Sequence, residues 1–301
     1  MIHSAKVYYL LAGLRSAVSP GDFQSKNQIA SIRQKTTKVY KLLTANHIHE
    51  LYRYRDLILR VAWSDFKLRY KNSALGFFWS LLDPLLMLLV LYVVFTNLMR
   101  IQVEHYQLFL LLGIILWNFL DRGTSLSIWG IVGKPSLVQK VYFPRDILVI
   151  STCIMALMMT VLEFVVFIIF MAVFRVVPGM TLAYVPIIFA CLFLIIIGLS
   201  LALAALNVYF RDVQFIWKVI VQIGFFATPI IYPITIFPEN VRWMVMINPM
   251  AQIITMMRDC ILYRTGPEPM SLAYMGICSI LVLFAGYLIF DRLEPKFAEA
   301  I

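Results

Sequence analysis

Residues 147–174 read ILVISTCIMALMMTVLEFVVFIIFMAVF, and Glu163 is the one charged residue in this 28-residue run. An apolar stretch of roughly 18 residues or more is long enough to cross the ~30 Å hydrocarbon core of a bilayer as a helix. Similar apolar stretches occur at 77–98, 106–125, 182–209, 215–232 and 272–290. The sequence therefore predicts an all-α membrane protein with six transmembrane helices.

The composition of the chain favours the same class. Hydrophobic residues make up 61% of it and charged residues 14%, whereas a soluble domain carries roughly 25% charged residues. The excess of 26 Lys and Arg over 16 Asp and Glu requires no nucleic-acid partner, because basic residues gather beside membrane helices on the cytoplasmic side. If the N-terminus is cytosolic, 21 Lys and Arg lie on the cytosolic side and 5 outside. We therefore expect a multi-pass protein of the cytoplasmic (inner) membrane with both termini in the cytosol.

The segments around the predicted spans differ in character. Residues 1–48 are polar and basic and are interpreted as a cytosolic N-terminal extension, and 294–301 as a cytosolic tail, so that 72–293 form the transmembrane domain. Residues 49–71 place apolar residues at helical spacing among many basic ones, which is typical of an amphipathic helix lying in the headgroup layer. A helix packed on a soluble domain is the alternative.

Prolines interrupt the chain after the fifth predicted span. They lie at 229, 233, 238 and 249, and the apolar stretch between them is short. A spanning helix must satisfy its own backbone hydrogen bonds, which proline prevents. We therefore expect two short re-entrant or interfacial helices on one face within 233–263.

The loop at 121–146 is the longest internal connection predicted on the cytosolic side. Residues 127–132 and 136–141 are each suited to a short amphipathic helix, which would serve as a docking lever for a cytosolic partner; a simple solvated connector is the alternative. Residues 130–136 read GIVGKPS, which lacks the spacing of a phosphate-binding loop and has Pro135 where the hydroxyl belongs. The four histidines all lie outside the spans, so no metal site is predicted.

Two acidic residues fall within predicted spans, where charges are costly and often functional. Asp83 precedes Pro84 in the first span, and Glu163 lies midway along the third. Each either lines a polar pathway or is neutralised by a partner within the bundle. Aromatic residues near the span ends belong either to the interfacial belt or to a surface that packs on sugar rings.

Four segments together resemble one family. They are LYRYRDLILRVAWSDFKLRYKNSALGFFWSLLDPLL (51–86), VQKVYFPRDILVIS (138–151), NVYFRDVQFIWKVIVQIGFFATPIIYP (207–233) and INPMAQII (247–254). They look like the membrane subunit of polysaccharide ABC exporters of the ABC-2 class, over roughly 50–293. The resemblance implies a transport permease that is not itself an enzyme, works as a homodimer and binds two copies of a cytosolic ABC ATPase subunit. ATP and Mg would bind to that partner, and this chain would bind no cofactor.

The implied cargo is a lipid-linked polysaccharide, of the O-antigen, capsule or teichoic acid kind, that passes through a channel at the dimer interface. Basic residues of the interfacial helix are candidate contacts for a lipid diphosphate: Arg55, Arg60 and Arg69. The candidate channel-lining residues are Asp83, Tyr92, Phe95, Phe225, Phe226 and Tyr232. The candidate ATPase-coupling residues are Lys140, Val141, Tyr142, Phe143, Pro144, Arg145 and Asp146.

Two other function classes remain open at this point. An ABC-2 permease for a drug or a small lipid would share the fold. A membrane-embedded transferase acting on lipid-linked sugars or acyl groups would cluster catalytic Asp, Glu or His on one membrane face. Such residues are scattered in this sequence, which disfavours the transferase.

Overall fold

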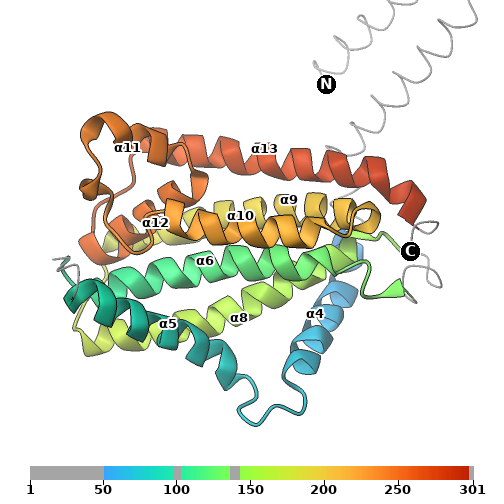
Figure 1. Ribbon diagram of the computed structural model, residues 1–301, viewed down its shortest axis with the longest axis horizontal. Coiled ribbons are helices and arrows are strands. Elements are labelled where there is room, and N and C mark those ends of the chain that lie inside the picture. The colour runs from blue at the N-terminus through green and yellow to red at the C-terminus, as the bar shows by residue number, and fades with distance from the viewer. Residues whose placement is uncertain (1–50, 98–102, 136–142, 298–301) are drawn as a thin grey trace, which may run out of the picture. The chain divides into compact units, whose positions relative to one another are not determined.

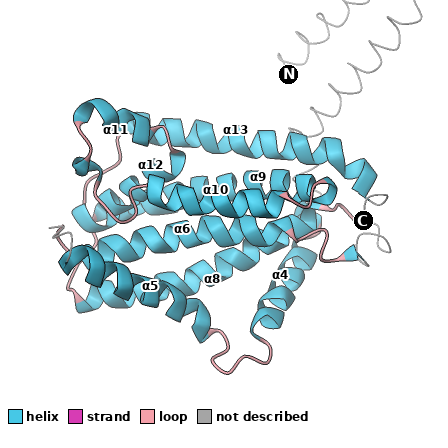
Figure 2. Ribbon diagram, in the orientation of Figure 1, coloured by secondary structure: helices cyan, strands magenta, loops and turns pink. Residues whose placement is uncertain are grey.

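The computed structural model describes residues 51–97, 103–135 and 143–297, and these residues form helices joined by turns and loops, without strands (Figure 2). The chain divides into two units, 1–55 and 56–301, and the second contains the bundle described below. Its helices are α4 (Arg55–Tyr70), α5 (Phe78–Asn97), α6 (Tyr106–Ile128), α8 (Asp146–Val173), α9 (Val185–Tyr209), α10 (Val213–Ala227), α11 (Glu239–Met246), α12 (Pro249–Arg258) and α13 (Pro269–Leu293). Shorter turns are η1 (Met180–Tyr184), η2 (Ile234–Ile236), η3 (Asp259–Tyr263) and η4 (Glu294–Lys296).

Within the described residues, five helical segments are long and apolar enough to cross a membrane. They are Phe78–Thr96, Tyr106–Ile128, Asp146–Val173, Met180–Tyr209 and Pro269–Leu293. The helix predicted at 215–232 is shorter than expected, because α10 ends at Ala227. Thr228 is extended, at φ −97° and ψ 141°, since the residue before a proline disfavours the α conformation. With 15 residues, α10 is about 22 Å long, less than the ~30 Å hydrocarbon core.

The helix α6 lies at the centre of the bundle, between α8 and α9 with α10 beside it (Figure 1). Every residue from Leu108 to Trp117 is buried. A helix that is apolar on all sides, as this one is in its first half, is expected to be enclosed by other helices. α6 therefore forms the common wall against which the other helices pack.

α6 continues to Ile128, beyond the predicted end at 125. The expectation that Asp121 and Arg122 lie in a loop is therefore wrong: both are helical, and Arg122 is tolerated because it pairs with carboxylates of neighbouring helices. The separate helix expected at 127–132 is also absent, because Ser127 and Ile128 are the last turn of α6 and the chain then turns. The one expected at 136–141 lies outside the described residues.

α9 and α13 cross with their backbones in contact. A Cβ added to Gly286 would lie 1.9 Å from the carbonyl oxygen of Gly198. Small residues at helix crossings permit such close approach in membrane proteins. Both positions therefore require glycine for this packing.

The proline-rich stretch does contain two short helices, α11 and α12, after α10. Pro249 occupies the first turn of α12, and the side chain of Asn248 accepts a hydrogen bond from the backbone N–H of Met250, which caps this helix. The helix expected within 49–71 is present as α4, which buries Ala62 against Met155 and Met159 of α8.

Candidate functional site

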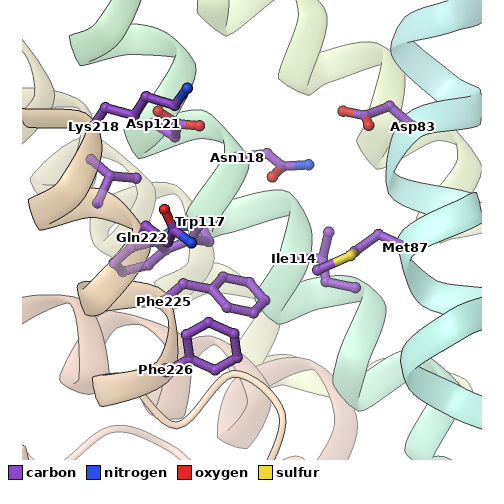
Figure 3. Close-up of a pocket in the computed structure, with 11 residues that line it drawn as sticks. Asp83, Met87, Ile114, Trp117, Asn118, Asp121, Lys218, Gln222, Phe225 and Phe226 are labelled. Atoms are coloured by element: carbon purple, nitrogen blue, oxygen red, sulfur yellow. The ribbon is translucent and has the colours of Figure 1, made fainter. Parts of the chain in front are cut away.

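A cavity of about 460 Å³ lies between α5, α6 and α10. Its volume is within the range of small-molecule sites. Figure 3 shows side chains from these three helices turned toward a common space. Its lining residues are Asp83, Met87, Ile114, Trp117, Asn118, Asp121, Lys218, Val221, Gln222, Phe225 and Phe226.

Aromatic rings form one wall of this cavity. The rings of Trp117 and Phe225 meet edge to face at 6.1 Å and 74°, and Phe225 meets Phe226 at 5.4 Å and 88°. Gly224 permits this packing, because a Cβ there would lie 2.8 Å from Trp117 Cη2. The opposite end of the cavity carries amide, carboxylate and ammonium groups (Figure 3). The combination of ring faces with hydrogen-bonding groups suits a ligand with both apolar and hydroxyl-rich surfaces.

An ion-pair cluster adjoins the cavity at Asp83. The guanidinium of Arg122 on α6 donates to Asp83 Oδ2 on α5 at 3.0 Å and also to Glu163 Oε1 on α8. The side chain of Asp83 is 70% exposed and that of Glu163 is fully buried. Of the two possibilities left open by the sequence, Glu163 is neutralised within the bundle, whereas Asp83 is both paired and in the cavity wall.

The other predicted channel residues lie outside this cavity. Tyr92 is half-buried, with its ring 6.2 Å from that of Tyr106. Phe95 is half-buried against the core. The hydroxyl of Tyr232 donates to the carbonyl of Phe226 at 2.8 Å. The structure thus brings together Asp83, Phe225 and Phe226 of the six.

A second arginine, Arg258, is 3% exposed and went unnoticed as a candidate in the sequence. It donates to the carbonyls of Phe109, Pro229 and Ile230, at 2.6 to 3.2 Å. Its guanidinium carbon lies 3.4 Å from the centroid of the Phe109 ring. Arg258 thus satisfies the carbonyls of Pro229 and Ile230, which the break after α10 leaves without helical partners. In the sequence, Arg258 could have been recognised as a candidate because it lies in the largely apolar stretch 250–262, close to the prolines.

Comparison with known proteins bears on this arrangement. The model of the ABC-2 type transporter family matches residues 56–262. The chain belongs to this family. As an ABC-2 transporter with five long apolar helices in the part that the structure describes, it is a multi-pass transport permease of the inner membrane.

Individual relatives of this ABC-2 transporter align over most of their length. An O-antigen export system permease protein RfbA of Myxococcus xanthus is 30% identical over 84% of this chain and 98% of the relative. A protein of the same name from Klebsiella pneumoniae is 29% identical over 82% of this chain and 95% of the relative. The polysialic acid transport protein KpsM of Escherichia coli is 22% identical over 76% and 90%.

The predicted diphosphate contacts of this ABC-2 transporter are not gathered at one place. Arg55, Arg60 and Arg69 are all exposed on α4. At about 100° per residue, however, Arg60 and Arg69 point to opposite sides of the helix. A single phosphate group is therefore not contacted by all three at once.

The predicted coupling segment is described from Phe143 onward, and Lys140, Val141 and Tyr142 lie outside the described residues. Phe143 and Pro144 are half-buried, and Asp146 is buried at the start of α8. Arg145 donates to the backbone carbonyl of Glu294 at 2.8 Å. Burial raises the pKa of the Glu294 carboxyl, repulsion from Asp146 adds to the rise, and Arg145 opposes it.

The connection after α6 is attached to α4 as well. The ammonium group of Lys134 forms an ion pair with Asp65 on α4, and both side chains are mostly buried. This lysine belongs to the GIVGKPS stretch. The two described ends of the connection between α6 and α8 are therefore attached to different elements, α4 and the C-terminal turn η4.

Proposed function

We propose that this chain is the transmembrane subunit of an ATP-driven exporter that moves a lipid-linked polysaccharide across the cytoplasmic membrane. The observation that carries the proposal is the alignment with polysaccharide permeases over 76–84% of the chain. The names of these relatives cover two kinds of polysaccharide, O-antigen and polysialic acid. We therefore propose polysaccharide as the class of cargo for this chain, and not one particular glycan.

The cavity supports a sugar-containing cargo. Aromatic faces at Trp117, Phe225 and Phe226 suit the apolar faces of sugar rings. Asn118 and Gln222 offer both hydrogen-bond donors and acceptors for hydroxyl groups. We propose that this cavity is a section of the transport path, with Asp83, Phe225 and Phe226 in its wall.

ATP hydrolysis is assigned to a separate chain. The sequence lacks a phosphate-binding loop. The stretch most similar to one is GIVGKPS at 130–136, and its Lys134 forms an ion pair with Asp65. We propose that two copies of a cytosolic ATPase, carrying ATP and Mg, dock on a homodimer of this chain through residues 140–146. Exposed apolar side chains on α5 and α10, such as Leu89, Val90 and Ile223, are available for the second copy or for lipid.

The proposed topology has six crossings with both termini in the cytosol. Five are the long apolar helices, and the remaining one, fifth along the chain, consists of α10 and residues 228–231, which continue from it. At one end of this crossing Trp217 Nε1 donates to Thr124 Oγ1 near the end of α6, and at the other Tyr106 Oη at the start of α6 donates to the carbonyl of Ile231. The segment thus runs along about 27 Å of α6, which approaches the core thickness. The short helices in 233–263 are then re-entrant or interfacial on the outer face.

Deleting the gene in the source organism tests the function. We expect surface glycan to be lost and lipid-linked glycan to accumulate on the cytosolic side, with both effects reversed by a plasmid copy. A matched copy with Phe225→Ala and Phe226→Ala is expected to restore export only partly. Normal surface glycan in the deletion strain would refute the proposal, and loss of resistance to a drug without any glycan change would point to the small-molecule alternative.

A further inference from the structure

The cluster of Asp83, Arg122 and Glu163 joins three helices through one guanidinium. Arg122 on α6 uses Nη1 for Glu163 on α8 and Nη2 for Asp83 on α5. Each terminal nitrogen therefore serves a different helix. Only Asp83 of the three belongs to the cavity wall.

The two arms of this cluster differ in burial. The Glu163 side chain is 0% exposed and that of Arg122 is 13% exposed, whereas Asp83 is 70% exposed. Breaking a buried pair leaves an uncompensated charge and is strongly unfavourable, while a pair that is solvated by cavity water is screened and contributes little. Glu163 Oε2 is buried with no hydrogen-bond partner among the described residues, so loss of Arg122 would leave the whole carboxylate unpaired. The Glu163 arm is thus fixed and the Asp83 arm is exchangeable.

The helix that carries Asp83 is also the more loosely attached one. In its most apolar window α5 has 22% of residues buried, against 78% in α6. Pro84, directly after Asp83, lies inside α5 and removes a backbone hydrogen-bond donor there. When Asp83 departs, water from the cavity can solvate Nη2 of Arg122 while Glu163 still supplies the counter-charge. α5 is therefore able to move without leaving a bare charge in the bundle.

We propose that Glu163 and Arg122 are positioning residues for the cavity: Glu163 fixes Arg122, and Arg122 holds Asp83 in the cavity wall by a contact that is released when α5 moves outward to admit a ligand. This deepens the proposed function, since it takes the cavity as part of the transport path. The ion-pair arrangement itself does not depend on the nature of the cargo.

The test measures how accessible the cavity is in the full-length chain in lipid nanodiscs. Met87 lies one helical turn after Asp83 on α5, lines the cavity and is 38% exposed. The parent for all variants carries Met87→Cys and Cys278→Ser, because the three remaining cysteines are buried. The readout is the initial rate at which a water-soluble maleimide labels the new cysteine, with a chain lacking Met87→Cys as the blank.

Asp83→Asn is expected to raise the labelling rate about two- to five-fold, because loss of an exposed ion pair changes the equilibrium between the closed and open cavity by about that factor. Asp83→Glu keeps the carboxylate and should return the rate to near that of the parent. Asp121→Asn is the matched control, because it removes an equal charge from the same cavity, yet Asp121 accepts its bond from Ser125 on its own helix. An equal effect of Asp83→Asn and Asp121→Asn would overturn the proposal.

The positioning role predicts that the substitutions depend on one another. Glu163→Gln should raise the rate as Asp83→Asn does, and Glu163→Asp should restore it. In an Arg122→Gln background Asp83→Asn should add nothing, because the contact is already lost. An undiminished effect of Asp83→Asn without Arg122 would refute the role. If Glu163→Gln does not fold, the comparison of Asp83→Asn and Asp83→Glu with the parent still tests the proposal, because Asp83 is exposed.

The labelling needs no glycan, so the two proposals fail separately. A deletion strain with normal surface glycan refutes the transport function whatever the labelling shows. Unchanged labelling in Asp83→Asn refutes the positioning role even if export by this chain is established.

Discussion

Two arginines in this bundle, the half-buried Arg122 and the buried Arg258, are surrounded by different kinds of partner. Arg122 pairs with two carboxylates that belong to separate helices, α5 and α8. Arg258 donates only to backbone carbonyls among the described residues, and two of these, Pro229 and Ile230, belong to the break after α10. Arg122 therefore links the side chains of separate helices, whereas Arg258 supplies hydrogen-bond donors to backbone carbonyls.

This difference predicts different mechanical roles. A side-chain carboxylate can rotate away or move with its helix, and Arg122 keeps a second partner when one leaves. The carbonyls around Arg258 are fixed by the course of the chain, so their hydrogen bonds are lost only if the segment rearranges. We infer that Arg258 fastens a static part of the bundle, whereas Arg122 lies where helices are able to separate.

Arg258→Leu is expected to have the largest effect on stability. It leaves the buried carbonyls of Pro229 and Ile230 without these donors, whereas Phe109 lies within α6 and keeps its helical hydrogen-bond partner. At about 1–3 kcal/mol for each unsatisfied group, the free energy of unfolding should fall by roughly 3 kcal/mol or more. The midpoint of thermal unfolding in detergent measures this loss.

Arg242→Leu is the matched control for this prediction. Arg242 also donates to a carbonyl, that of Phe237 at 3.0 Å, but its side chain is 37% exposed. Water replaces the lost donor there, so the midpoint should change little. Equal losses in the two variants would contradict the fastening role of Arg258.

Glu163→Gln is expected to have an intermediate effect. It removes the buried counter-charge of Arg122, which is then left with the exposed Asp83. Breaking buried pairs costs about 3–5 kcal/mol, and the remaining partner should reduce the loss to roughly 2–3 kcal/mol. The double variant Arg122→Met with Glu163→Met removes both charges and should recover most of that stability. A double variant less stable than Glu163→Gln would show that the pair stabilises the bundle beyond neutralising its own charges.

Asp83→Asn is expected to have the smallest effect on stability. Exposed ion pairs contribute about 0–1 kcal/mol, and Asp83 is 70% exposed. The unfolding midpoint should therefore stay close to that of the wild type, although the labelling rate of the cavity rises. A loss comparable with that of Glu163→Gln would mean that the two arms are equally fixed.

The apolar helices could be predicted from the sequence because membrane burial depends on length and composition alone. The helix of residues 147–174 is found within one residue at each end, at Asp146–Val173. The error at α10 arose because apolar residues continue past Ala227, although Pro229 ends the helix. The prolines predicted short helices within 233–263, and α11 and α12 have 8 and 10 residues.

The polar contacts were harder to predict, because they depend on which faces of distant helices meet. Arg122 was placed in a loop, since charges are normally expected outside a span, and its two partners lie 39 and 41 residues away in the chain. The candidate arginines on α4 were chosen for charge density, which ignores that Arg60 and Arg69 project from opposite sides of a helix. Asp83, Phe225 and Phe226 reach one cavity because α5 and α10 both pack on α6.

The contact of Gly198 with Gly286 holds α13 rigidly against α9. Because the two backbones touch, α13 cannot slide or rotate past α9 without a clash. One end of α13 leads into Glu294, which binds Arg145, and near the other end the hydroxyl of Tyr274 donates to the carbonyl of Ile247 between α11 and α12. Because α13 is held to α9, we expect a displacement at Arg145 to move the two helices together and so to reach the short helices, 25 residues or about 37 Å along α13.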